Sequence, residues 1–336
     1  MNKEIKVSLL DLGVVKQGKE IADALADITT NAQKVEELGF HRIWLAEHHN
    51  MPTVSTAATA VLIGHIAGRT SRIRVGAGGI MLPNHSPLSV TEEFGTLDTL
   101  YPGRIDLGLG RAPGTDQPTA AALRRGNLAS QNDFPRDIQA LQQFFSSDNS
   151  QSNVRAFPGE GRKVPLYILG SSTDSAYLAA ELGLPYAFAS HFAPTQLFPA
   201  LEIYRQNFKP SEVLKEPYVM AAVNVIAADT DEEAAHLRTS LDLMALGMVT
   251  GKRGKLSPPV DEMPEIFYHP EVQQALGRLS TFTFDGSKET IRLKINEFLE
   301  QTGADELITT NYIYDQEARL KSFDLLAEAL ELNCLV

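Results

Sequence analysis

The sequence predicts an α/β protein folded as a (β/α)8 TIM barrel, and two observations carry this prediction. Short apolar runs alternate with amphipathic segments along almost the whole chain of 336 residues. The apolar runs show little polar alternation, which is typical of parallel strands that are buried on both faces. Eight such runs, each followed by a helix, close most economically as a barrel, and an open doubly wound sheet is the alternative.

The predicted strands are rich in Val, Ile, Leu or aromatic residues. In chain order they are residues 5–10, 42–46, 73–79, 104–109, 165–169, 185–190, 218–227 and 306–310. The segments between them have helical periodicity. A stripe of apolar side chains spaced by three or four residues predicts the first helix, with Gly39 as its stop. The stripe consists of Ile21, Leu25, Ile28, Ala32 and Val35.

Polar residues placed before apolar stripes predict where the later helices begin. Ser86 precedes Pro87, and this pair is typical of the cap and first position of a helix. The other expected N-caps are Ser172 or Thr173, Ser287 and Asp315.

The composition contains no break that would mark a linker, so residues 1–336 are expected to form a single domain. Two connections are nevertheless too long for ordinary loops. They span about residues 111–134, after the fourth strand, and about residues 251–285, between the seventh and eighth strands. Loops of this length commonly act as lids, and both would leave from the same end of a barrel.

The charge balance and the cysteine content exclude several classes of protein. Lys plus Arg is 30 and Asp plus Glu is 42, which gives a net charge of −12. An acidic chain without a basic run is not expected to bind nucleic acid or an anionic membrane. The single cysteine, Cys334, excludes an internal disulfide, a cysteine zinc site and an iron–sulfur cluster. The charged N-terminus and the lack of a long apolar run predict a soluble, cytoplasmic protein.

The first group of candidate functional residues is Glu47-His48-His49, directly after the second predicted strand. Side chains at this end of a strand point into the mouth of a barrel. Histidine there could be a general base, a metal ligand or a structural hydrogen-bonding group. A metal would need ligands at other strand ends, where only His191 is well placed, so no metal is expected.

Three glycines, Gly76, Gly78 and Gly79, end the third predicted strand. They would allow a flat ligand to approach closely or an unusual peptide geometry, or they mark a tight barrel corner.

After the fourth strand, the segment from Gly108 to Gly114 is one residue off the dinucleotide fingerprint, and no helix follows promptly, so a Rossmann site is rejected.

Arg111 lies within that segment as a lone cation at a strand end. It is either a phosphate ligand or the partner of a loop carboxylate such as Asp116. After the fifth strand, Gly170, Ser171 and Ser172 precede an expected helix start. Backbone N–H groups, hydroxyls and the helix dipole could bind an anion there, and simple N-capping is the alternative.

These four groups lie at the carboxyl ends of consecutive strands, so they would converge on one ligand. That ligand would have a phosphate near Arg111 and the serines, a planar body near Gly78 and Gly79, and a proton-transfer partner in His48. FMN fits this description.

The same motifs resemble those of the bacterial luciferase-like flavin-dependent monooxygenases. The resemblance is carried by residues 44–49 (WLAEHH), 78–83 (GGIMLP), 97–104 with 108–111 (LDTLYPGR and GLGR), and 169–172 (LGSS). Residues 111–116 (RAPGTD) also match a signature of uncharacterised flavin-dependent oxidoreductases within the family.

This resemblance implies a TIM barrel that binds reduced FMN at its carboxyl-terminal mouth. It implies that His48 assists proton transfer around a flavin hydroperoxide, with His49 as an essential neighbour. It further implies phosphate binding by Arg111 and Ser171, and a cis peptide bond between Gly78 and Gly79 under the flavin ring. The implied partners are O₂, a small organic substrate, a separate flavin reductase and a second copy of the chain, packed through helices that include residues 56–68.

Some residues depart from the family pattern. Gly110 stands where light-emitting members carry a reactive cysteine, and Gly170 and Asp174 replace an acidic residue and a threonine. Light emission is therefore not implied. Two further functions remain open, a hydride-transfer oxidoreductase that uses a deazaflavin or a flavin, and a flavin-binding protein without turnover. His48 and His49 argue against the latter, because storage of a flavin needs no base.

Overall fold

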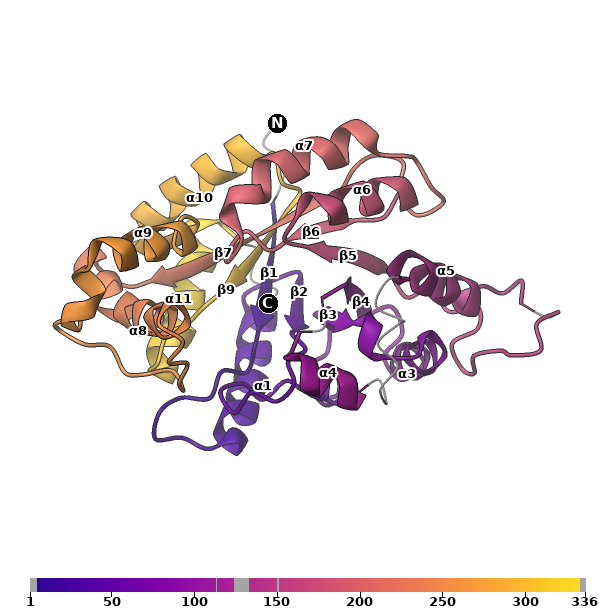
Figure 1. Cartoon of the computed structure of the whole chain (residues 1–336), viewed down its shortest axis with the longest axis horizontal. Coiled ribbons are helices and arrows are strands. Elements are labelled where there is room, and N and C mark those ends of the chain that lie inside the picture. Colours follow the sequence, from indigo (N-terminus) through magenta and orange to yellow (C-terminus); the bar gives the residue numbers. More distant parts are fainter. Residues whose placement is uncertain (1–4, 113, 124–132, 150, 333–336) are drawn as a thin grey trace.

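The computed structural model describes residues 5–112, 114–123, 133–149 and 151–332. Its centre is a closed ring of eight parallel strands with helices between them, so the predicted TIM barrel is confirmed and the open sheet is wrong (Figure 1). The ring closes through the pairs β6–β7 and β9–β1. Its strands are β1 (Lys6–Asp11), β2 (Arg42–Leu45), β3 (Arg74–Met81), β4 (Ile105–Gly110), β5 (Leu166–Gly170), β6 (Tyr186–Phe188), β7 (Val219–Ala227) and β9 (Glu306–Thr310).

A short ninth strand, β8 (Thr283–Gly286), lies outside the ring. It pairs with the second half of β7, whose first half pairs with β9. Helices α8 (Asp231–Val249) and α9 (Pro270–Leu279) pack together beside it (Figure 1). The expectation of one long loop over residues 251–285 is therefore wrong. Proline is compatible with the first turn of a helix, and Pro270 begins α9 rather than prolonging a loop.

The other long connection, over residues 111–134, contains the helix α4 (Gln117–Leu123). Pro113 and residues 124–132 of that connection lie outside the described residues, as does Cys334. No described helix is long and apolar enough to cross a membrane.

The helices of the barrel begin where the polar residues predict. Ser86, Ser172, Ser287 and Asp315 are all N-cap residues, although only Asp315 accepts a backbone N–H with its side chain. The helices are α1 (Ile21–Glu37), α2 (Thr59–Ala67), α3 (Pro87–Leu100), α5 (Phe134–Phe145), α6 (Thr173–Leu182), α7 (Leu197–Asn207), α10 (Lys288–Thr302) and α11 (Gln316–Ala329).

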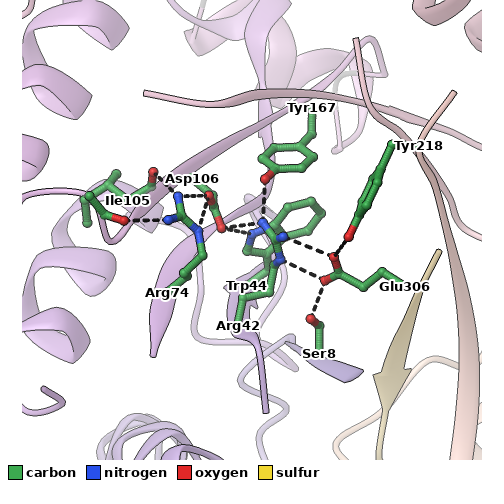
Figure 2. Close-up of polar contacts among 10 residues, drawn as sticks. Ser8, Arg42, Trp44, Arg74, Ile105, Asp106, Tyr167, Tyr218 and Glu306 are labelled. Atoms are coloured by element: carbon green, nitrogen blue, oxygen red, sulfur yellow. Dashed lines mark hydrogen bonds and ion pairs between the residues drawn. The ribbon is translucent and has the colours of Figure 1, made fainter. Parts of the chain in front are cut away.

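A buried ion-pair cluster fills the amino-terminal end of the barrel (Figure 2). Arg42, the first residue of β2, donates to Asp106 of β4 at 2.7 Å and to Glu306 of β9 at 2.8 Å and 3.1 Å. Tyr167 accepts a further hydrogen bond from Arg42 at 2.7 Å, and Tyr218 donates to Glu306 at 2.7 Å. Burial alone would lower the pKa of Arg42, but the two carboxylates raise it above its ordinary value.

Above this cluster lies an apolar layer that includes Leu10, Trp44, Met220 and Ile308. In the part of the chain that the structure describes, side chains therefore fill the amino-terminal end of the barrel, and the cavity lies towards the carboxyl ends of the strands. This is the end at which TIM-barrel proteins carry their functional sites.

Candidate active site

A cavity of about 540 Å³ occupies the carboxyl-terminal mouth of the barrel. Its floor comes from the strand ends and their following loops, and one wall comes from α8 and α9. Most of the residues predicted from the sequence line this cavity, and they are His48, Gly78, Arg111, Gly170, Ser171 and Ser172. His49 and Gly79 do not line it. The structure thus brings together groups that follow four different strands.

The His48 imidazole is held in an orientation suited to accept a proton. Its Nδ1 lies 3.2 Å from the carbonyl oxygen of Gly114. Because a carbonyl only accepts, Nδ1 carries the proton and Nε2 is left with its lone pair. Burial lowers the pKa of His48 below its usual value, and the nearby Arg253 charge acts in the same direction. His48 is therefore neutral at neutral pH, the form a general base requires.

His49 contributes to a different cluster. Its Nε2 lies 2.8 Å from Oε1 of the buried Glu47, and the same oxygen lies 2.8 Å from Nε2 of His85. The N–H of Met81 donates to the other carboxylate oxygen at 3.0 Å. Burial would raise the pKa of Glu47, but the hydrogen bonds from His85 and His49 hold it below its usual value. His49 and His85 therefore both hydrogen-bond to an ionised carboxylate, and this carboxylate connects the loops after β2 and β3.

Sequence reasoning missed His85, which follows β3 in the segment before α3. The sequence does contain a signal for His85, because it is a further histidine near the end of a predicted strand. The donor atoms of Glu47, His49 and His85 all lie within 4.8 Å of one another, so this group could hold a metal ion. Hydrogen bonding to Glu47 accounts for the same geometry without a metal, and the absence of a metal stays a prediction.

The peptide bond between Gly78 and Gly79 is cis, as the family resemblance implied. Gly78 faces the cavity beside Leu10 and Trp44. A Cβ atom on Gly79 would lie 2.7 Å from the backbone oxygen of Gly108, so β4 leaves no room for a side chain there. The register between β3 and β4 shifts at this point. The glycine pair therefore makes the wall of the barrel irregular at this point, and it leaves a flat backbone surface at the cavity.

Arg111 follows β4 and points its guanidinium towards α6. Its Nη2 lies 3.3 Å from the carboxylate of Asp174, and both side chains are more than half exposed. Arg111 therefore has a carboxylate partner, as one alternative expected, but the partner is Asp174 and not Asp116, which accepts from Asn50 and from the N–H of Thr119. Asp174 lies in the first turn of α6, two residues after Ser172. A cation, two hydroxyl groups and a helix start therefore meet at one edge of the cavity, a combination suited to a phosphate.

The residues that line the cavity and that the predicted site omitted include His191 and Arg253. His191 follows β6, and its buried Nδ1 has no hydrogen-bond partner among the described residues. Burial lowers its pKa to about 4. Arg253 reaches the cavity from the segment after α8, which the sequence placed in a loop. The sequence contains no signal for the role of Arg253, because this residue does not follow a strand of the ring.

A closed parallel barrel with a largely apolar cavity and converging polar groups at its mouth defines a TIM-barrel enzyme. The family model described as luciferase-like monooxygenase matches residues 6–306. An Escherichia coli K12 protein named luciferase-like monooxygenase is 47% identical over 330 residues, which cover 98% of each chain. The chain therefore belongs to the luciferase-like monooxygenases, a family of oxidoreductases.

Two solved structures agree with this assignment. The structure of apo-MsnO8 has a TM-score of 0.88 and 34% identity, and the match covers 98% of this chain and 99% of that one. The oxygenating constituent of 3,6-diketocamphane monooxygenase from Pseudomonas putida, solved in complex with FMN, has a TM-score of 0.73 at 17% identity and covers 97% of each chain. The second likeness, at this low identity, concerns the fold.

Proposed function

We propose that the protein is a monooxygenase that uses reduced FMN and O₂ to oxygenate a small organic substrate. The observation that carries this proposal is that His48, the cis Gly78–Gly79 bond and Arg111 at the start of α6 all lie at one cavity. The structure of the Pseudomonas putida monooxygenase, which has the same fold, contains FMN. Reduced FMN, when bound, supplies the activation of O₂.

The residues of this chain would bind and orient the flavin, accept a proton and exclude water. Arg111, Ser171 and Ser172 would bind the phosphate, and Gly78 would let the flavin ring lie against the wall of the barrel. His48 would accept a proton at Nε2. The apolar residues of the cavity would exclude water from the reacting atoms. His49 does not line the cavity, so we propose that it acts with Glu47 and His85 to position the loop that carries His48.

The proposal also includes two protein partners, a separate flavin reductase and a second copy of the chain. The homodimer would pack through α2, where Val61 is 72% exposed, and through the neighbouring α3, where Leu100 is 63% exposed. Contiguous apolar patches mark interfaces, and Val61 and Leu100 would contribute to such a patch. Light scattering of the purified protein would measure the mass of the assembly directly.

The test of the proposed function is a titration of the protein with photoreduced FMN under argon, followed by mixing with air. We expect saturable binding of reduced FMN, and O₂ uptake that is coupled to product formation once a substrate is present. Saturable binding of a reduced deazaflavin instead, with no O₂ uptake, would favour hydride transfer. Binding of FMN without any reaction with O₂ or with candidate substrates would favour a storage protein, and no binding would contradict a flavin site.

Replacing Arg111 by alanine should weaken the binding of FMN by roughly 10- to 150-fold, the range expected for a charge-assisted hydrogen bond. Riboflavin lacks the phosphate, so its affinity should stay within about twofold. Asp174→Asn removes the carboxylate that now holds Arg111, and it should strengthen FMN binding. Arg136→Ala is the matched control, because Arg136 is exposed on α5 and does not line the cavity. An equal loss for FMN and riboflavin in the Arg111 variant would remove Arg111 from the phosphate site.

A further inference from the structure

The cavity has an apolar wall that the proposed flavin site leaves unused. This wall comes from α8 and α9, which lie outside the ring of strands. It faces the mouth of the barrel with aliphatic and thioether side chains. They are Leu241, Met244, Ala245, Met248, Leu276 and Leu279. A surface of this composition suits the hydrocarbon part of a substrate.

Among the residues that the structure describes, the charged side chains that line the cavity are Arg111, Asp242 and Arg253. Two of them already have partners within the chain. Arg111 lies 3.3 Å from Asp174, and Asp242 lies 3.4 Å from Nε of Arg238. Arg253 makes no hydrogen bond or ion pair with any described residue. Within this described set, it is therefore the cation that is free to take an anion from a ligand.

The backbone near Arg253 is held on both sides, while the Arg253 side chain itself is exposed to solvent. On one side, the carbonyl oxygen of Lys252 packs against Gly247 of α8. A Cβ atom on Gly247 would lie 2.8 Å from that oxygen. On the other side, the buried Leu256 exchanges backbone hydrogen bonds with Val15 and Gln17 at 3.0 Å and 2.8 Å. Arg253 and His48 both line the cavity. Arg253 thus lies at the cavity in which the proposed chemistry takes place.

We propose that Arg253 binds a carboxylate group of the substrate, while the apolar body of the substrate packs against the wall formed by α8 and α9. A guanidinium presents two parallel N–H donors that match a carboxylate, and such a pair strengthens when water is excluded. The proposal rests on the proposed function, since it assigns the FMN phosphate to Arg111 and leaves Arg253 to the substrate. The substrate class is an amphipathic carboxylic acid.

The experiment compares the binding of octanoate and octanol, which differ at the carboxylate, by calorimetry on the full chain with and without FMN. The variants are Arg253→Gln, Arg253→Lys, Arg111→Ala and Lys252→Gln. Lys252→Gln is the matched control, because it removes the same charge from the adjacent residue, which does not line the cavity. We expect the unmodified protein to prefer octanoate by about 10-fold or more. Arg253→Gln should abolish the preference, Arg253→Lys should keep part of it, and the other two variants should retain it.

Three results of the preference measurement would overturn the proposal, and a fourth comes from the affinity for FMN. They are an absence of preference in the unmodified protein, a loss of preference in Lys252→Gln equal to that in Arg253→Gln, and a loss confined to Arg111→Ala. The last result would mean that the carboxylate occupies the phosphate site. A fall in FMN affinity in Arg253→Gln would also overturn it, because Arg253 would then be a cofactor ligand. The binding preference is measured without turnover, so it can stand or fall separately from the monooxygenase activity.

Discussion

Replacing Arg42 by methionine should lower the free energy of unfolding by about 3–5 kcal/mol, the cost typical of breaking a buried ion pair from one side. Arg42 is almost fully buried, and it neutralises Asp106 and Glu306, which are wholly buried (Figure 2). Asp106 keeps a second cation, because Arg74 also donates to it. Among the described residues, Glu306 keeps only the hydrogen bonds from the hydroxyl groups of Ser8 and Tyr218. The loss should therefore arise mainly at Glu306.

The measurement is urea unfolding at pH 7, followed by circular dichroism. The matched control is Arg69→Met, an exposed site where the change should stay within about 0.5 kcal/mol. Adding Glu306→Gln to Arg42→Met should recover part of the loss, because the uncompensated charge is then gone. A loss below about 1 kcal/mol in the single variant would contradict a stabilising role for the cluster. A lack of recovery in the double variant would contradict the assignment of the loss to Glu306.

Replacing His48 by alanine should lower the turnover number by about 10²- to 10⁴-fold, the contribution typical of a general acid or base. Binding of reduced FMN should change little, because the phosphate contacts lie at the Arg111 side of the cavity. The measurement combines the rate of product formation with a titration of reduced FMN under argon. His236→Ala is the matched control, since His236 is partly exposed on α8 and does not line the cavity. Full turnover in His48→Ala would refute the role of His48.

The pH dependence of turnover gives a second readout for His48. A base must be neutral, and a histidine is neutral above its pKa. Burial lowers the pKa of His48 below the usual value of 6.5 for a histidine, so the neutral form predominates at pH 6.5 and is lost as the pH falls further. The midpoint of the decline in turnover should therefore lie below pH 6.5. His48→Ala should lack this decline, and the same decline in the variant would assign it to another group, such as the His49–Glu47–His85 cluster.

The prediction of the barrel succeeded because its signals are local. A strand buried on both faces must be apolar along its length, and a helix packed on the sheet must repeat its apolar residues every three or four positions. The same logic located the edge of the cavity, since parallel strands place all their carboxyl ends together. His48, Gly78, Arg111 and Ser171 could thus be assigned to one site before their distances were known. The roles of these residues stay predictions.

The sequence by itself determined the eight-stranded ring, the starts of its helices and the set of strand ends that form the site. The tertiary structure alone decided which side chains touch. His49 contacts Glu47 instead of lining the cavity, and His85 contacts the same carboxylate. Arg111 pairs with Asp174 rather than with Asp116. The tertiary structure also folded residues 270–286 into α9 and β8, and it brought Arg253 to the mouth of the barrel. The physical reason is that each of these contacts joins residues of different segments, whose approach depends on the packing of the whole barrel and leaves no periodic pattern in the sequence.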